Sequence, residues 1–375
     1  MNLSRVLPVL GQYGVDPALV LVPPEGGLLE VYRDVGFPTS TFHLYSKRFP
    51  SFWRYYQSLY ELVSPIVSSH ADLVHINHHY GLEYTTRAVR LSNRPYIVHV
   101  RGIESPQWVQ DNAVYLANAA RLVAVSRAVK ERLMTSDLLA KQANTSLQGD
   151  VSQFVEVVHD GVPIPTLERM DARQRVRREL GIEENTLLVG LIARLEPLKG
   201  VADLLTAVAD LRQVLACFKL VIVGTGQSSY VAELESLTHR LSMENSVVFT
   251  GFRSDVPAVL AALDLLVVAT HDPLTGQGEA FPNIVLESMQ AQTPIVARRA
   301  GGLGEILDEE SGILVPPNGV EPLRNGIMTA LMMSADKRQA MVQTAYQIVN
   351  TRFTLQNQAQ QLASIYHQLI SRNRI

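Results

Sequence analysis

The sequence of 375 residues has one cysteine, no large excess of charge of either sign and no long hydrophobic run. The single Cys217 cannot form a disulfide within the chain, which favours a reducing compartment, and its apolar surroundings (LACFKLVIVG) predict a buried, inert thiol. No stretch approaches the ~20 apolar residues of a membrane-spanning helix, and no N-terminal segment has the pattern of a signal peptide. We therefore expect a cytoplasmic protein whose contact with a membrane, if there is one, is peripheral.

An excess of positive charge is also missing. The net charge is −3, and residues 1–165 hold 14 basic and 14 acidic side chains, against 19 and 22 in the remainder. Neither half is a polycation, so the charge gives little support to nucleic-acid binding. With 47% hydrophobic and 18% charged residues, the composition is that of a folded chain and not of a disordered one.

What the sequence contains is an alternation of short β-branched apolar runs with longer amphipathic segments. This alternation predicts βα units on parallel sheets. The cycle runs twice, so we predict an α/β protein with two Rossmann-like, doubly wound domains that face a cleft. The predicted strands lie at 17–23, 71–77, 94–100, 121–126 and 154–162 in the first series, and at 185–194, 218–226, 245–252, 263–270, 293–302 and 311–317 in the second.

The predicted boundary lies near residues 163–170, where two prolines interrupt the regular pattern before a charged helix begins. The first domain is assigned to 1–165 and the second to 166–353, and the last helix, 354–375, is expected to return to the first domain. A Rossmann-like half normally opens with a strand and a Gly-rich turn. The chain begins instead with a helix-like segment, so the first domain is expected to lack its opening strand.

The sharpest motif is GEAFPNIVLESM, in which Glu279 and Glu287 are separated by seven residues across a strand-to-helix transition. Pro282 suits the first helical turn. The backbone amides of 281–284 would then lie free at a helix N-terminus, where the helix dipole favours a diphosphate. Two carboxylates beside such a site suit a sugar on one side and a ribose on the other. The alternative is a solvated helix with two surface glutamates.

Arg194 and Lys199 lie in the loop of a strand–loop–helix segment. Open α/β sheets bind ligands at the carboxyl ends of their strands, where this loop is predicted to lie. A guanidinium and an ammonium directed at one diphosphate would stabilise the charge of a leaving group, so no metal is required. The histidines of HINHHYG, which are His75, His78 and His79, do not have the spacing of a metal-ligand set.

Together these motifs resemble glycosyltransferase family four, the retaining group with the GT-B fold that is also described as glycosyl transferases group 1. The resemblance covers nearly the whole chain. It implies a hexosyltransferase that moves a sugar from a UDP- or GDP-sugar to a hydroxyl of a saccharide or lipid-linked acceptor, in polysaccharide or glycoconjugate biosynthesis. The matching segments are the Arg194/Lys199 loop, GTG at 224–226, VVFTGFRSDV at 247–256, the Glu279-to-Glu287 motif, AGGLGEIL at 300–307 and SGILVPP, with softer matches in DLVHIN, HVRG, VAVSRAVKERL and VVHDGV.

The resemblance also implies roles for single residues. Arg194 and Lys199 would hold the donor diphosphate, Glu287 the ribose hydroxyls and Glu279 the donor sugar, and Arg194, Lys199 and Glu279 would take part in catalysis. Front-face attack, with the departing phosphate as the base, would explain retention without a protein nucleophile, a metal or another cofactor. The remaining donor-site residues would be Gly251, Phe252 and Arg253 near the base, and the backbone of Phe281, Pro282, Asn283 and Ile284 over the sugar and phosphate.

The first half departs from the family pattern at the end of the strand RPYIVHVRG. Many members carry a histidine directly before this glycine, and this chain has Arg101, with His99 two residues earlier on the same face. Both are candidates for the acceptor or sugar side of the site. Arg101 either contacts the donor sugar or phosphate, or pairs with a carboxylate such as Glu104.

The segment KRFPSFWRYYQSLYELV interleaves basic and aromatic residues before an apolar helix face. Trp53, Tyr55 and Tyr56 could lie at a lipid headgroup boundary or flank a sugar acceptor. The alternative is an ordinary helix that packs its aromatic side chains inward.

Other functions also use Rossmann-like halves. A nicotinamide dehydrogenase is disfavoured, because Ser229 occupies the place of the third glycine in the dinucleotide fingerprint. Two alternatives stay open: a sugar-nucleotide epimerase or hydrolase, and a nucleotide-sugar-binding protein without turnover.

Overall fold

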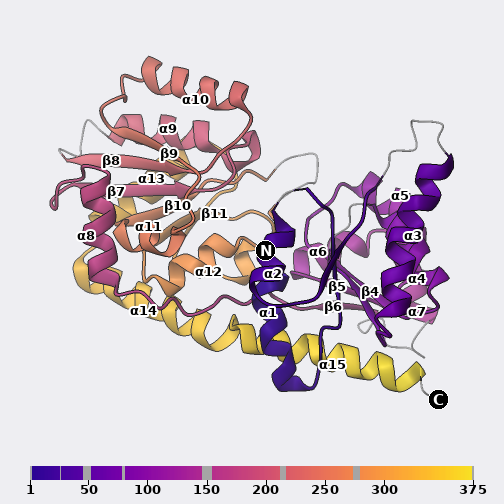
Figure 1. Ribbon diagram of the computed structural model, residues 1–375. Helices are drawn as coiled ribbons and strands as arrows, with labels where there is room; N and C mark the ends of the chain where they lie inside the picture. The colour runs from indigo at the N-terminus through magenta and orange to yellow at the C-terminus, as the bar shows by residue number, and fades with distance from the viewer. Residues whose placement is uncertain are drawn as a thin grey trace. The chain divides into compact units, whose positions relative to one another are not determined.

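The computed structural model describes residues 2–25, 27–44, 52–77, 81–145, 154–211, 217–272 and 279–373. The chain forms two compact units (Figure 1). Unit 1 comprises Met1–Gly161 and Thr354–Ile375, and unit 2 comprises Val162–Phe353. Each unit alternates helices with strands that pair in parallel, as the sequence predicts.

Unit 1 holds a two-stranded sheet, β1-β2, and a four-stranded sheet of order β3-β4-β5-β6. A helix and a 3₁₀ turn precede β1 among the described residues. The strands are β1 (Val20–Val22), β2 (Thr39–Thr41), β3 (Val74–Ile76), β4 (Tyr96–Val100), β5 (Arg121–Ala124) and β6 (Val155–Val157). The helices are α1 (Asn2–Leu10), α2 (Leu28–Asp34), α3 (Phe52–Ser68), α4 (Leu82–Leu91), α5 (Pro106–Ala117), α6 (Arg127–Leu133), α7 (Asp137–Thr145) and α15 (Leu355–Asn373), with a 3₁₀ turn at Gly11–Tyr13.

The C-terminal helix α15 packs within unit 1 against α1. The apolar side chains of α1 recur at the spacing of one helical face and are buried with those of α15. The chain passes close to itself at Gly161, where an added Cβ would lie 2.3 Å from the carbonyl oxygen of Thr354. Gln358 of α15 ties this contact, because its Oε1 accepts from Gly161 N at 3.0 Å and its Nε2 donates to Asp160 at 3.0 Å.

Unit 2 is built on a six-stranded parallel sheet of order β12-β11-β10-β7-β8-β9. If β7 is counted as strand 1 of the unit, the order read from the β9 edge is 3-2-1-4-5-6, which is the order of a Rossmann sheet. The direction of winding reverses between β7 and β10. The strands are β7 (Leu187–Ile192), β8 (Phe218–Val223), β9 (Val247–Gly251), β10 (Leu265–Val268), β11 (Ile295–Arg298) and β12 (Ile313–Val315). The helices are α8 (Arg169–Glu179), α9 (Val201–Leu211), α10 (Ser228–Arg240), α11 (Val256–Ala262), α12 (Asn283–Gln290), α13 (Val320–Met332) and α14 (Ala335–Arg352), with 3₁₀ turns at Pro197–Lys199 and Gly301–Glu305.

The central strands of unit 2 are apolar on both faces. Every residue of β10 is buried, which is the pattern expected when helices cover both sides of a parallel sheet. The prediction of a buried Cys217 is wrong: the residue is exposed, because it lies just before β8 and outside the buried part of the strand.

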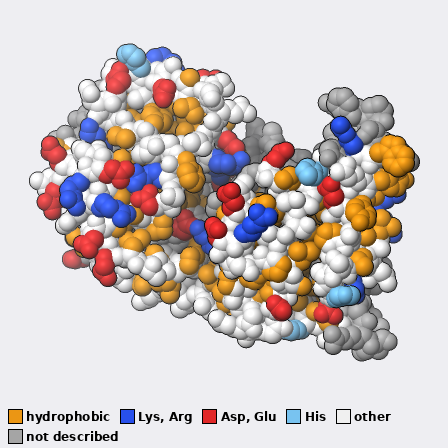
Figure 2. All heavy atoms as spheres, viewed as in Figure 1, with side chains coloured by type: hydrophobic (Ala, Val, Ile, Leu, Met, Phe, Trp, Pro, Cys, Tyr) orange, Lys and Arg blue, Asp and Glu red, His pale blue; other side chains and the backbone are white. Residues whose placement is uncertain are grey.

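The surface of the protein mixes charges of both signs. On the face that Figure 2 shows, Lys and Arg side chains lie among Asp and Glu side chains over unit 2. Within the described parts of the chain, no helix is both long and apolar enough to cross a bilayer.

Candidate functional site

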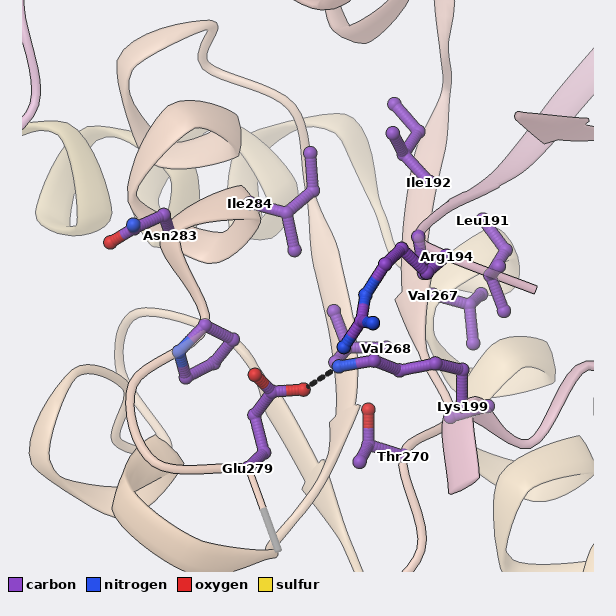
Figure 3. Close-up of a pocket in the computed structure, with 13 residues that line it drawn as sticks. Leu191, Ile192, Arg194, Lys199, Val267, Val268, Thr270, Glu279, Asn283 and Ile284 are labelled. Carbon is purple, nitrogen blue, oxygen red and sulfur yellow. Dashed lines mark hydrogen bonds and ion pairs between the residues drawn. The ribbon is translucent and has the colours of Figure 1, made fainter. Parts of the chain in front are cut away.

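A pocket of about 200 Å³ lies at the carboxyl ends of β7 and β10, where the winding of the unit 2 sheet reverses (Figure 3). Its walls come from three segments: the end of β7 with its loop, the end of β10, and the start of α12. Reversal points of open α/β sheets are where such folds bind ligands. The lining residues are Leu191, Ile192, Ala193, Arg194, Lys199, Val267, Val268, Ala269, Thr270, Glu279, Pro282, Asn283 and Ile284.

The pocket brings together six of the residues predicted for the donor site. These residues come from two sequence motifs that lie about 80 positions apart, and the parallel sheet places them at one edge. They are Arg194, Lys199, Glu279, Pro282, Asn283 and Ile284.

Lys199 and Glu279 form an ion pair within this pocket, drawn as a dashed line in Figure 3. Only 17% of the Lys199 side chain and 19% of the Glu279 side chain are exposed, so water screens the pair less than it would on the surface. The backbone of Glu279 is also held, because its carbonyl oxygen accepts from Gly302 N at 3.1 Å. Lys199 therefore presents a fixed ammonium, and Glu279 a fixed carboxylate, to the pocket.

Arg194 adds a second cation at the mouth of the pocket. Its side chain is 78% exposed, and its guanidinium bonds to Glu196 at 2.8 Å. In Figure 3 the side chains of Arg194 and Lys199 both extend from the β7 side toward Glu279. An exposed ion pair such as Arg194–Glu196 contributes little free energy, so the guanidinium can exchange Glu196 for a ligand at low cost.

The start of α12 forms the wall opposite the two cations. Pro282 is the N-cap residue with an extended backbone (ψ 101°), and the helix begins at Asn283, so the prediction that Pro282 lies inside the first turn is wrong by one position. The first amides of a helix have no carbonyl partner one turn earlier, and the helix dipole makes this end positive. Asn283 Oδ1 is buried without a hydrogen-bond partner in the described structure. This wall thus offers donors to an anion and one free acceptor.

Five other residues predicted for the donor site do not line this pocket. Glu287 is half-buried further along α12, and Phe281 is buried with its ring edge-on to Phe353 at 5.7 Å. Gly251 ends β9 with a left-handed φ of 72°, and Phe252 after it is 71% exposed. Arg253 is the fifth.

Arg253 is engaged in a structural cluster. Its guanidinium bonds to Glu179 at 2.5 Å and to Asp255 at 2.8 Å, and only 12% of the side chain is exposed. The hydrogen bonds that Arg253 donates to Glu179 and to Asp255 raise the pKa of its guanidinium. A ligand that used Arg253 would have to share it with these two carboxylates.

In unit 1 the two predicted contacts are both engaged with the protein. His99 on β4 is fully buried and stacks on His75, with ring centroids 5.4 Å apart, so the ring has no access to a ligand in this structure. Arg101 pairs with the carboxylate of Asp160, whereas the sequence left open a contact with the donor or a pair with a carboxylate such as Glu104. Asp160 follows β6, a strand of the same sheet, and is 1% exposed. Local sequence patterns could not predict this pair, because Arg101 and Asp160 are 59 positions apart in the sequence.

Metal binding has no counterpart among the residues that the structure describes, where no three His, Cys, Asp or Glu side chains gather around one point. His75 belongs to this described part. His78 and His79 lie outside it.

Sequence analysis missed several residues that build the pocket. Thr270 lines the pocket two residues after β10, and Gly302 holds the backbone of Glu279. Arg298 is fully buried and bonds to Asp203 at 2.5 Å behind the pocket. Of these residues, only Gly302 lies in a motif used in the sequence analysis, AGGLGEIL. Arg298 could have been noticed because an arginine is unusual in an apolar strand such as IVARRAGG.

Comparisons with known proteins agree with this architecture. The family described as Glycosyl transferases group 1 matches residues 172–348. The D-inositol 3-phosphate glycosyltransferase of Corynebacterium kroppenstedtii is 30% identical over 264 residues, which are 68% of this chain and 54% of that protein. The 2-deoxystreptamine glucosyltransferase of Streptomyces kanamyceticus is 27% identical over 253 residues, 65% of this chain and 63% of that protein. The chain thus spans about half to two thirds of the length of these curated relatives.

Solved structures resemble the chain over almost its full length. Anabaena Alr3699/HepE in complex with UDP is 25% identical, with a TM-score of 0.78 over 98% of this chain and 96% of that one. A glycosyltransferase from Rickettsia africae is 17% identical, with a TM-score of 0.80 over 98% of this chain and 95% of that one, and supports the fold alone. Residues 172–348 thus match the family of glycosyl transferases group 1, and the fold of the chain is that of the GT-B glycosyltransferases.

Proposed function

We propose that the chain is a retaining glycosyltransferase that uses a nucleotide-diphosphate sugar, with a UDP-sugar as the first donor to test. One observation carries the proposal: the Lys199–Glu279 ion pair lies with Arg194 at the reversal point of the unit 2 sheet, opposite the start of α12. The complex of Anabaena Alr3699/HepE with UDP supports uracil as the base. A GDP-sugar is the alternative donor.

The donor would lie with its diphosphate between the two cations and the first amides of α12. Lys199 and Arg194 would meet the phosphate oxygens, and charge-assisted hydrogen bonds of this kind are about twice as strong as neutral ones. Lys199 would then divide its donors between phosphate and Glu279, which frees carboxylate lone pairs for hydroxyls of the donor sugar. Glu287 is proposed for the ribose, and Gly251 for the surroundings of the base.

The reaction would need no group other than those of the pocket and the substrates. As the bond between the anomeric carbon and the phosphate oxygen breaks, negative charge grows on the departing diphosphate, where Lys199 and Arg194 stabilise it. An acceptor hydroxyl attacks from the same face and gives its proton to the departing phosphate oxygen. The configuration is retained without a protein nucleophile, a metal or a further cofactor. The proposed acceptor is a saccharide or lipid-linked hydroxyl in polysaccharide or glycoconjugate biosynthesis.

Thermal unfolding with UDP, GDP and ADP and their sugar conjugates tests the donor. A ligand at 100 times its dissociation constant stabilises the native state by about 2.7 kcal/mol, so the true donor raises the melting temperature. Incubation with that donor then separates the functions. Transfer to an acceptor panel supports the proposal, whereas release of nucleotide with an altered sugar and no acceptor supports an epimerase or hydrolase. Binding without turnover supports a binding protein, and the absence of any nucleotide binding contradicts the proposal.

A peripheral membrane contact is proposed on a separate observation. Helix α3 exposes Trp53 (84%), Tyr56 (51%) and Tyr60 (71%), which recur at the spacing of one helical face. Figure 2 shows hydrophobic side chains gathered along the edge of unit 1 where α3 lies in Figure 1. Tyr55 instead packs inward, with its ring centroid 5.2 Å from that of Tyr84. Tryptophan and tyrosine favour the boundary between lipid headgroups and acyl chains.

Co-sedimentation with anionic vesicles tests this contact. We expect the wild-type chain to sediment with the vesicles, and the double variant Trp53→Ser/Tyr60→Ser to stay in solution. Val114→Ser is the matched control, because Val114 is 59% exposed on α5 and not on α3. A wild-type chain that does not sediment removes the proposal.

A further inference from the structure

Arg298 ends β11 and joins several segments of unit 2 behind the pocket. Its side chain is completely buried, and its guanidinium bonds to Asp203 Oδ2 at 2.5 Å. It also donates to the carbonyl oxygens of Ala269 at 2.8 Å and Gly319 at 2.8 Å, and lies 3.1 Å from His271 Nδ1. One side chain therefore joins the exit of β10, the first turn of α9 and the residue before α13.

The residues that follow β10 contact the turn that carries Lys199. His271 N donates to Leu198 O at 2.9 Å. An added Cβ on Gly200, which follows Lys199, would lie 2.0 Å from the carbonyl oxygen of Ala269. The turn that carries Lys199 thus rests on two of the residues that Arg298 holds, Ala269 and His271.

The other side of the same contact is also held. Asp203 lies in the first turn of α9, which begins at Val201, two residues after Lys199. Because Arg298 bonds to Asp203 as well as to Ala269, it fixes the helix that follows Lys199 and the strand exit beneath it. A change in either would move the Lys199 ammonium relative to Glu279.

The contact with Arg298 also orients the ring of His271. A guanidinium can only donate, so His271 Nδ1 is the acceptor in this contact. On the other side of the ring, Nε2 is 3.6 Å from Asp203 Oδ2. The orientation of the ring is therefore set by both partners of the same network.

We propose that Arg298 is a positioning residue of the donor site: it fixes the turn that carries Lys199, so that the ammonium is already in place for the donor diphosphate. The inference rests on the proposed function for the identity of the ligand. A planar guanidinium can reach four partners in fixed directions, which an ammonium cannot do. Replacing a buried ion pair by apolar side chains is often neutral for stability, so stability alone does not explain a buried arginine here.

Arg177 provides a matched control at the other end of β10. It is also buried in unit 2, donates to Ala262 O at 3.1 Å and to Glu183 O at 2.8 Å, and pairs with Asp264 at 3.3 Å. Asp264 directly precedes β10, whereas Arg298 acts where β10 ends. Loss of either arginine removes a buried network, but only Arg298 lies behind the pocket.

The experiment compares Arg298→Met, Arg298→Lys and Arg177→Met with the wild-type chain. Hydrogen exchange of the backbone is measured over 196–204 and 269–272, and UDP affinity by calorimetry. We expect Arg298→Met to speed exchange in both segments and to weaken UDP binding by about tenfold, because misplacement of a binding group by about 1 Å is costly. Arg298→Lys should show the same pattern in weaker form, and Arg177→Met should leave both segments and the UDP affinity as in the wild type.

The outcomes separate the two proposals. If the wild-type chain binds no nucleotide, the proposed function is wrong, and the exchange data still decide whether Arg298 holds the Lys199 turn. If Arg298→Met does not fold, Arg298→Lys carries the test. Unchanged exchange and unchanged UDP affinity in a folded Arg298 variant, or equal losses in Arg177→Met, would overturn the positioning role.

Discussion

Lys199 and Glu279 meet in an ion pair although 80 positions of sequence separate them. The two residues lie in the strand-to-helix loops of different βα units, and the parallel sheet brings these loops to one edge. With no ligand bound, each neutralises the other in a place with little water. The pair therefore keeps two opposite charges ready for a ligand that is itself charged at one end and hydroxylated at the other.

Lys199→Met should weaken binding of UDP by about tenfold to hundredfold, because a hydrogen bond to a charged group in a partly buried site contributes about 1.5–3 kcal/mol. Calorimetric titration with UDP measures this loss. Lys219→Met is the control, since Lys219 bonds to the backbone of Asn245 and does not line the pocket. Equal affinities of the Lys199 variant and the wild type would remove Lys199 from the diphosphate site.

Glu287→Gln tests the ribose contact that we propose for α12. If Glu287 accepts from the ribose hydroxyls, the variant should bind UDP about tenfold more weakly and pyrophosphate as well as the wild type, because pyrophosphate has no ribose. Competition between the two ligands in one calorimetric series measures both affinities. Glu233→Gln on α10 is an exposed control. A parallel loss for UDP and pyrophosphate would instead assign Glu287 to the architecture of the helix.

The sequence predicted the parts of this protein that depend on local patterns. Short β-branched runs with both faces apolar predict buried parallel strands, and β10 follows that rule at every residue. The pocket was predictable for the same reason, since Lys199 and Glu279 each follow a strand end. Parallel strands place such loops at one edge without any knowledge of the loops themselves.

The parts that the sequence did not predict depend on pairs of distant segments. The pairs Arg101–Asp160 and Arg298–Asp203 join residues that are distant in the sequence, and the sheets bring them together. No periodicity of the sequence indicates either pair. Pro282 was placed one residue too far into the helix, because the position of an N-cap depends on the backbone angles and not on the residue alone.

Two stacked histidines should make unit 1 sensitive to acid. Burial lowers the pKa of His75 to about 3, and it lowers the pKa of His99 well below its ordinary value. In the unfolded chain both titrate near pH 6.5. Between about pH 6.5 and 3, the unfolded state therefore binds protons that the folded state excludes, so stability falls as the pH falls. Each histidine contributes a slope of at most about 1.4 kcal/mol per pH unit.

Urea unfolding at pH 7.5, 6.5 and 5.5 measures this slope. Both tryptophans of the chain, Trp53 and Trp108, lie in unit 1, so their fluorescence follows the unit that contains the histidines. His99→Leu should unfold with a smaller dependence on pH. His239→Leu, with a side chain 83% exposed, should not change the dependence. The same slope in His99→Leu and the wild type would exclude His99 as a source of the acid sensitivity.

Gly200→Ala should damage the donor pocket more than it damages the rest of unit 2. Gly200 has a φ of 67°, and its added Cβ would lie 2.0 Å from a backbone oxygen of Ala269, so the Lys199 turn has to move. Gly181 has a similar φ of 64° with nothing within 4 Å of an added Cβ. Gly181→Ala should therefore lower the free energy of unfolding only by the cost of a left-handed φ, about 1–2 kcal/mol, and the variant should bind UDP normally. Gly200→Ala should lose more stability and bind UDP more weakly, whereas equal effects of the two variants would show that the approach to Ala269 does not set the position of Lys199.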